Sequence, residues 1–181
     1  MNARPRIDFG GGDRRVCLAM NRWVARHALI RLFRLVSRIG DGAFWYALMA
    51  AIALLGGASG RWIALQMAIT GLVAATLYRT LKRWTRRPRP FRAHADITAH
   101  IAPLDEFSFP SGHTLHAVTF SVVALGHLPL LAPLLLPFTL LVAISRVVLG
   151  LHYPSDVLAA MLIGIVLAAT SLQFGSLLPP P

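Results

Sequence analysis

The chain has 181 residues, enough for one domain; 56% of them are hydrophobic and only 14% are charged, against about 25% charged residues in typical soluble domains. This balance excludes an ordinary soluble domain and predicts an all-α, multi-pass transmembrane bundle. The net charge of +11 does not indicate nucleic-acid binding, because nine arginines lie in residues 1–42 and seven basic residues in 79–92, beside apolar segments where they meet anionic headgroups.

The N-terminal region is basic and amphipathic. Residues 1–16 predict a disordered tail, and residues 17–42 predict a helix that ends at Gly40-Asp41-Gly42. The apolar side chains of this helix fall on one side of a helical wheel and its arginines on the other, so we expect it to lie in the membrane interface and bind anionic headgroups. A membrane span is the alternative, although one arginine at the bilayer centre costs at least ~2.5 kcal/mol. Cys17 is the single cysteine, so no intrachain disulfide can form.

The rest of the chain alternates between apolar and polar stretches. Five apolar segments predict five membrane spans, at residues 43–58, 62–81, 114–128, 130–149 and 157–175. With five alternating helices, the long polar stretch 82–113 and the junction 150–156 fall on the same side of the membrane. The proline-rich tail, residues 176–181, cannot continue the last helix.

Two of the three clusters that stand out lie in the long polar stretch. The basic run Lys82-Arg83-Trp84-Thr85-Arg86-Arg87-Pro88-Arg89-Pro90 is, by itself, best explained as a positively charged loop beside a membrane. The run Pro110-Ser111-Gly112-His113 precedes an apolar helix. Ser111 is a favoured N-cap, and the free N–H groups of a helix N-terminus suit an anion. The positive helix end disfavours a protonated His113 unless an anionic substrate lies nearby.

The third cluster, Ser145-Arg146 followed by His152 and Asp156, is the most informative. Arg146 lies within the apolar run 140–151, where a charge indicates function. His152 and Asp156 are four residues apart, so the carboxylate can reach the imidazole. A carboxylate on one ring nitrogen makes the other nitrogen a better nucleophile or base. A structural His–Asp pair is the alternative for this cluster taken alone.

Together, the spacings Lys-x6-Arg-Pro, Pro-Ser-Gly-His and Ser-Arg-x5-His-x3-Asp resemble, at every motif position, those of the type 2 phosphatidic acid phosphatase family. The superfamily also includes glucose-6-phosphatase and the vanadium haloperoxidases. The resemblance covers residues 82–156 closely and implies a membrane phosphatase domain over residues 43–175.

The resemblance implies a role for each motif residue. His152 would attack phosphorus and form a phosphohistidine, Asp156 would orient it, and His113 would protonate the leaving oxygen. The phosphoryl oxygens would be bound by Lys82, Arg89, Ser111, Gly112 and Arg146. Three fixed cations can supply the charge that a metal ion supplies elsewhere, so no metal or other cofactor is expected. His113 and His116 could suggest a metal pair, but no complementary carboxylate or cysteine cluster accompanies them.

The expected substrate is a lipid phosphate or pyrophosphate of the undecaprenyl pyrophosphate, phosphatidylglycerol phosphate, phosphatidate or lipid A class, and the expected location is a bacterial inner membrane. Two alternatives are a vanadate-dependent haloperoxidase and a non-catalytic membrane adaptor. The apolar spans argue against the first, and the intact motifs argue against the second. The lipid, the membrane side of the site and the oligomeric state stay open at this point.

Overall fold

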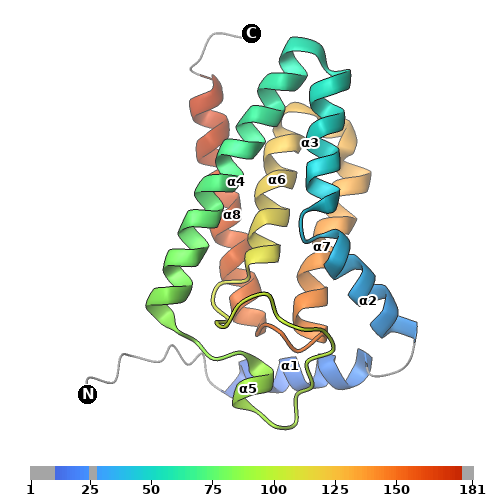
Figure 1. Cartoon of the computed structure of the whole chain (residues 1–181), viewed down its shortest axis with the longest axis vertical. Coiled ribbons are helices and arrows are strands. Elements are labelled where there is room, and N and C mark those ends of the chain that lie inside the picture. Colours follow the sequence, from blue (N-terminus) through green and yellow to red (C-terminus); the bar gives the residue numbers. More distant parts are fainter. Residues whose placement is uncertain (1–10, 25–27, 177–181) are drawn as a thin grey trace.

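The computed structural model describes residues 11–24 and 28–176, and the elements found in them are helices (Figure 1). The helices are α1 (Gly11–Val24), α2 (Ala28–Ile39), α3 (Ala43–Leu55), α4 (Gly57–Thr85), α5 (Pro90–Ala93), α6 (Gly112–His127), the 3-10 helix η1 (Pro129–Leu131), α7 (Ala132–Val148) and α8 (Pro154–Ser176). The five apolar segments predicted from the sequence correspond to α3, α4, α6, α7 and α8. The prediction of an all-α bundle is therefore confirmed.

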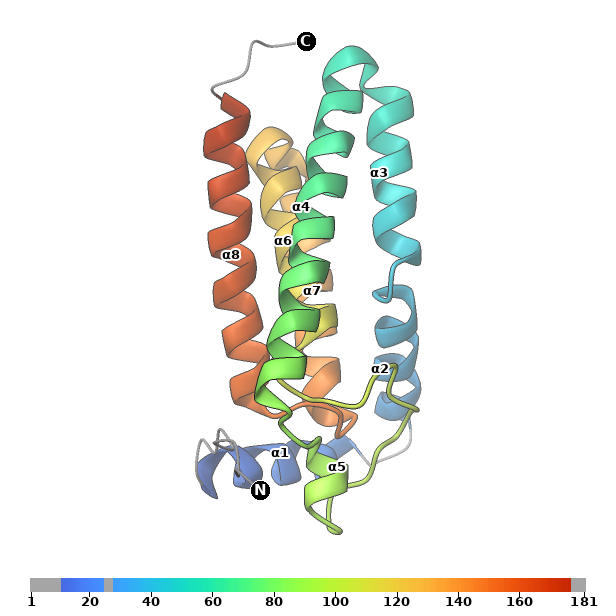
Figure 2. The same ribbon diagram turned by 60° about the vertical axis from the view of Figure 1, so that its left-hand side comes forward.

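Helix α6 occupies the centre of the bundle, where it packs against α4, α7 and α8 (Figures 1 and 2). Helix α3 packs against α4 on one side. The main core lies between these helices, and its largest fully buried side chains are Trp45, Met67, Val123, Leu135 and Val142. Because α6 begins at Gly112, this packing fixes the position of the Pro110–His113 motif at one end of the bundle.

The outer face of the bundle is apolar, as a lipid-facing surface requires. Large side chains such as Leu54, Leu72 and Leu162 are exposed there. Among the described residues, three helical stretches are long and apolar enough to cross a membrane: Gly57–Thr85, Pro129–Val148 and Pro154–Gly175. Helices α2 and α3, bent by 48° at their junction, would make a fourth as one broken span. The predicted number of five spans is thus not confirmed.

The N-terminal region differs from the single helix predicted over residues 17–42. Helix α1 begins at Gly11, inside the predicted disordered tail, and lies across one end of the bundle (Figures 1 and 2). Helix α2 packs against α7 and leads directly into α3. The rest of the predicted tail, residues 1–10, and the C-terminal residues 177–181 lie outside the described residues.

Candidate active site

The two polar regions of the chain meet at one end of the bundle, around a cavity of about 900 Å³. The segment 86–111 approaches it from α4, and the turn 149–153 between α7 and α8 closes it from another side. The predicted site residues in its lining are Lys82, Arg89, Gly112, His113, Arg146 and His152. Ser111 and Asp156 are fully buried and lie outside this lining.

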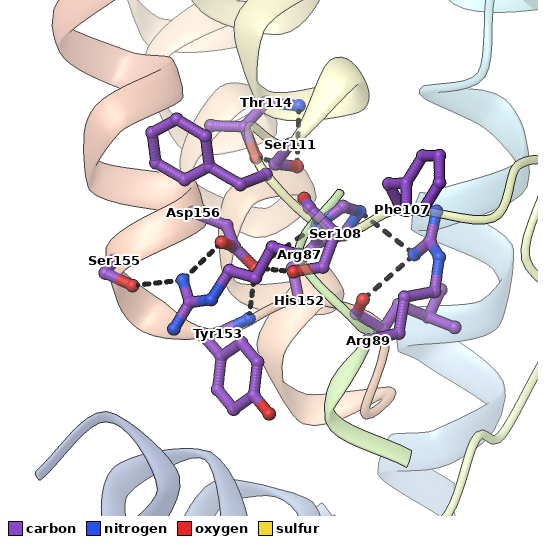
Figure 3. Close-up of polar contacts among 12 residues, drawn as sticks. Arg87, Arg89, Phe107, Ser108, Ser111, Thr114, His152, Tyr153, Ser155 and Asp156 are labelled. Atoms are coloured by element: carbon purple, nitrogen blue, oxygen red, sulfur yellow. Dashed lines mark hydrogen bonds and ion pairs between the residues drawn. The ribbon is translucent and has the colours of Figure 1, made fainter. Parts of the chain in front are cut away.

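His152 lies in the turn before α8 and is 1% exposed. Its Nδ1 is 2.7 Å from the carbonyl oxygen of Ser108 (Figure 3). Because a carbonyl only accepts, Nδ1 carries the proton and Nε2 keeps the lone pair that a nucleophile needs. Burial, followed by the charges of Arg89, Arg146 and Lys82, holds the pKa of His152 well below its usual value. The imidazole is therefore neutral near neutral pH.

Asp156, in the first turn of α8, is held by three donors (Figure 3). Its carboxylate accepts hydrogen bonds from Arg87 Nη1 (2.6 Å), Ser108 Oγ (2.8 Å) and the Tyr153 backbone N–H (2.8 Å). The sequence predicted a bond between this carboxylate and His152. Asp156 Oδ2 lies 3.7 Å from His152 Nδ1, so the Ser108 carbonyl is the nearer acceptor and the carboxylate acts on the ring through its charge.

Arg87 extends this network to helix α1. Its Nη2 lies 2.6 Å from Asp13 Oδ2, and its guanidinium carbon lies 4.1 Å from the centre of the Tyr153 ring. Asp13 also accepts a hydrogen bond from the backbone N–H of Ser155 at 3.0 Å. The sequence did not single out Arg87, because it is one of five cations in the basic run and no spacing distinguishes it. A buried chain, Asp13–Arg87–Asp156, therefore joins α1 to the site.

Lys82 and Arg89, two predicted phosphate ligands, both bind the carboxylate of Asp105 in this structure. Lys82 Nζ lies 2.7 Å from both carboxylate oxygens of Asp105, and Arg89 Nη2 lies 2.7 Å from Oδ1. Arg89 Nη1 donates to the Leu151 carbonyl (2.9 Å) and lies 3.3 Å from His152 Nε2. Burial acts to raise the pKa of Asp105, but Lys82 and Arg89 outweigh it and keep that pKa below its usual value. The carboxylate is thus ionised, and it is the anion that these cations now bind.

Arg146, the third predicted phosphate ligand, is 2% exposed near the end of α7. Its Nη1 donates to Ser37 Oγ of α2, whereas its Nε has no hydrogen-bonding partner among the described residues. A buried donor without a partner costs about 1–3 kcal/mol. Arg146 also belongs to the lining of the cavity.

The Pro110–His113 motif forms the start of α6. Ser111 is the N-cap, as its position before the apolar helix predicted: its Oγ accepts from the Thr114 N–H at 3.5 Å and lies 2.9 Å from Thr114 Oγ1. Gly112 and His113 line the cavity. His113 Nε2 lies 3.1 Å from Asp41 Oδ1. The sequence treated Asp41 only as part of a helix break and did not anticipate this contact.

His116 also lines the cavity, but its ring is held by one residue of its own helix and one of α4. Its ring stacks on Phe120 with 5.4 Å between ring centres, and its Nε2 lies 3.2 Å from the Gly71 carbonyl oxygen. Within residues 11–24 and 28–176, no group of three or more His, Cys, Asp or Glu side chains is arranged to hold a metal ion.

Known proteins are similar to this chain in sequence and in architecture. The family model of the PAP2 superfamily matches residues 42–178. Undecaprenyl-diphosphatase BcrC of Bacillus subtilis is 35% identical over 136 residues, 75% of this chain and 70% of that protein. Decaprenylphosphoryl-5-phosphoribose phosphatase of Mycolicibacterium smegmatis is 35% identical over 153 residues, 83% of this chain and 82% of that protein.

The likeness extends to a solved structure. LpxE of Aquifex aeolicus superposes with a TM-score of 0.81 at 26% identity, covering 93% of this chain and 99% of that one. The family model covers residues 42–178, well over half of the chain. The chain belongs to the PAP2 superfamily.

Proposed function

We propose that this membrane protein is a lipid phosphatase that forms a phosphohistidine on His152. The observation that carries the proposal is the cavity, which joins the cluster of histidines and cations at the end of the bundle to an apolar wall between α3 and α4. Met49 of α3 and Ala68, Leu72 and Ala75 of α4 belong to this wall, and Leu72 is also exposed on the outer face. A phosphate can therefore reach His152 while an attached acyl or prenyl tail stays in the membrane.

The cations of the cavity would bind the phosphoryl group. A phosphate is an anion, as the Asp105 carboxylate is, and it would replace that carboxylate between Lys82 and Arg89. Arg146, with its unpaired Nε, and the Gly112 N–H at the start of α6 complete the set. Positioning and charge neutralisation are the main contributions to phosphoryl transfer, and these fixed groups supply both.

The reaction would then proceed in two displacements. His152 Nε2 attacks phosphorus, the P–O bond to the lipid breaks, and His113 gives its proton to the leaving oxygen. Water next attacks the phosphohistidine, gives a proton to His113, and releases phosphate with Nε2 restored. Asp156 and the Ser108 carbonyl hold the Nδ1 side of the ring, where the positive charge of the intermediate is stabilised.

The proposed substrate class is a lipid phosphate or diphosphate. Polyprenyl phosphates come first, because the relatives are named for undecaprenyl and decaprenyl lipids. Phosphatidylglycerol phosphate, phosphatidate and lipid A remain candidates for the same cavity. We also propose that α1, whose Arg14, Arg15 and Arg22 are exposed, binds anionic headgroups of a bacterial inner membrane.

The proposal is tested by phosphate release from detergent-purified protein in the presence of EDTA. The substrates are undecaprenyl pyrophosphate, phosphatidylglycerol phosphate, phosphatidate and lipid A. We expect release from at least one of them, and a loss of ~10³-fold or more in the His152→Ala protein. His127→Ala serves as the matched control, because His127 contacts Gln66 at the far end of α6 and should leave the rate unchanged.

Each result separates the proposal from its alternatives. Equal rates in the wild-type and His152→Ala proteins would exclude His152 as the nucleophile. Release from none of the lipids by folded protein would favour the non-catalytic adaptor. Halide oxidation in the presence of vanadate would favour a haloperoxidase.

A further inference from the structure

The junction between α2 and α3 forms a wall of the active site that none of the three motifs contains. The chain bends by 48° here, through Gly40, Asp41 and Gly42, and all three residues line the cavity. Gly42 has a φ of 129°, which favours glycine, and a Cβ at Gly40 would lie 2.7 Å from Val142 Cγ2 of α7. The bend therefore depends on both glycines, and it places Asp41 in the lining of the cavity.

Two side chains, one at the end of α2 and one in the junction, contact residues of the catalytic motifs. Ser37 Oγ accepts a hydrogen bond from Arg146, and Asp41 Oδ1 lies 3.1 Å from His113 Nε2. Ser37 is 1% exposed, whereas the Asp41 side chain is 42% exposed toward the cavity. Within the described part of the chain, the Asp41 carboxylate has no other ion-pair partner. The bend thus places the carboxylate, and His113 is the ionisable partner that it meets there.

We propose that Asp41 is a positioning residue that orients the His113 ring and stabilises its protonated form for donation to the leaving oxygen. The inference rests on the proposed function, in which His113 is the acid. Asp41 stays ionised throughout: the proton moves from His113 to the lipid oxygen and returns to His113 from the attacking water.

The charges around His113 explain why such a partner is needed. Lys82 approaches from α4, Arg146 from α7 and His152 from the turn before α8, and every one of these groups is cationic or neutral. The cations are required for the phosphate, yet burial, followed by the charges of Arg146 and Lys82, lowers the pKa of His113 to about 4. Asp41, from the α2–α3 junction, is the carboxylate in direct contact with the ring. Its negative charge acts in the opposite direction and favours the protonated ring that the reaction needs.

The test compares two substrates that differ in their need for an acid. A lipid monophosphate has a poor alkoxide leaving group, whereas p-nitrophenolate leaves without protonation. For Asp41→Asn we expect kcat/KM to fall about 10- to 100-fold on the lipid, within the ~10²–10⁴-fold contribution of general acid catalysis, and to change little on p-nitrophenyl phosphate. The basic limb of the lipid pH profile should move to lower pH, because the imidazolium has lost its anion. Asp41→Glu should recover part of the rate.

A matched control is Asp96→Asn, which removes one carboxylate from an ion pair with Arg14 outside the cavity. It should leave both substrates unaffected. An equal loss on both substrates in Asp41→Asn, or an unshifted pH profile, would overturn the role of Asp41 and assign it a structural part. Activity that survives His152→Ala would instead overturn the proposed function on which the inference rests.

Discussion

Asp105 lies where the phosphoryl oxygens of a substrate are expected, between Lys82 and Arg89. In the proposed reaction a substrate would displace this carboxylate, whose charge would compete with phosphate for the same two cations. We predict that Asp105→Asn binds the inhibitors vanadate and inorganic phosphate about threefold to tenfold more tightly. This corresponds to on the order of 1 kcal/mol, because the Asp105 side chain is 40% exposed and solvent screens the pair. The measurement is the inhibition constant of each anion.

Glu106→Gln is the neighbouring control, since Glu106 is 67% exposed and faces Arg92 at 3.7 Å rather than the two phosphate ligands. It should leave the inhibition constants near those of the wild type. Weaker inhibition in Asp105→Asn would show that Asp105 organises the cations for substrate instead of competing with it.

The sequence predicted six residues that line the cavity but not the partners that hold them. The family resemblance implied that Lys82, Arg89 and Arg146 bind phosphate, and the structure brings these three side chains to one cavity. Asp105 and Asp41 could not be assigned, because their contacts depend on how a loop and a helix break fold back onto the motifs. The Asp156–His152 bond was expected from a four-residue spacing, but Ser108, 44 residues away in the sequence from His152, is the nearer partner.

Among the elements, α1 shows most clearly how a buried polar side chain docks a helix. Asn21 is 3% exposed; its Nδ2 donates to the carbonyls of Thr98 and Val148 at 2.9 Å each, and its Oδ1 accepts from the Thr98 N–H at 3.0 Å. We predict that Asn21→Ala destabilises the protein by about 2 kcal/mol, because it leaves backbone groups without partners. That loss lowers the midpoint of thermal unfolding in detergent by about 4–8 °C.

The adjacent Arg22 is exposed and gives a matched control. Arg22→Ala should leave the midpoint nearly unchanged, and a similar shift in both variants would contradict the docking role of Asn21. The helical wheel predicted an amphipathic segment over residues 17–39 but could not show that it forms two helices with different directions. The helical wheel could not indicate that Asn21 is buried, because a polar residue on a basic amphipathic helix is ordinarily assigned to solvent.

For the whole molecule, composition and apolar segment length predicted the all-α bundle, and the same segments form α3, α4, α6, α7 and α8. The count of membrane spans could not be fixed in the same way. Helix α6 has only 16 residues and is surrounded by other helices, and α2 and α3 share one bent path. Segment length measures how far a helix reaches, whereas burial by neighbours decides which helices meet lipid.

The proposed mechanism requires a covalent bond between His152 and the phosphate of the substrate. The most direct test is to quench turnover of a lipid substrate radiolabelled in its transferred phosphate, and to map the labelled peptide. We predict an acid-labile, alkali-stable label on His152, with no label in the His152→Ala protein. A label on another residue, or sustained turnover in which no protein-bound phosphate forms, would contradict it.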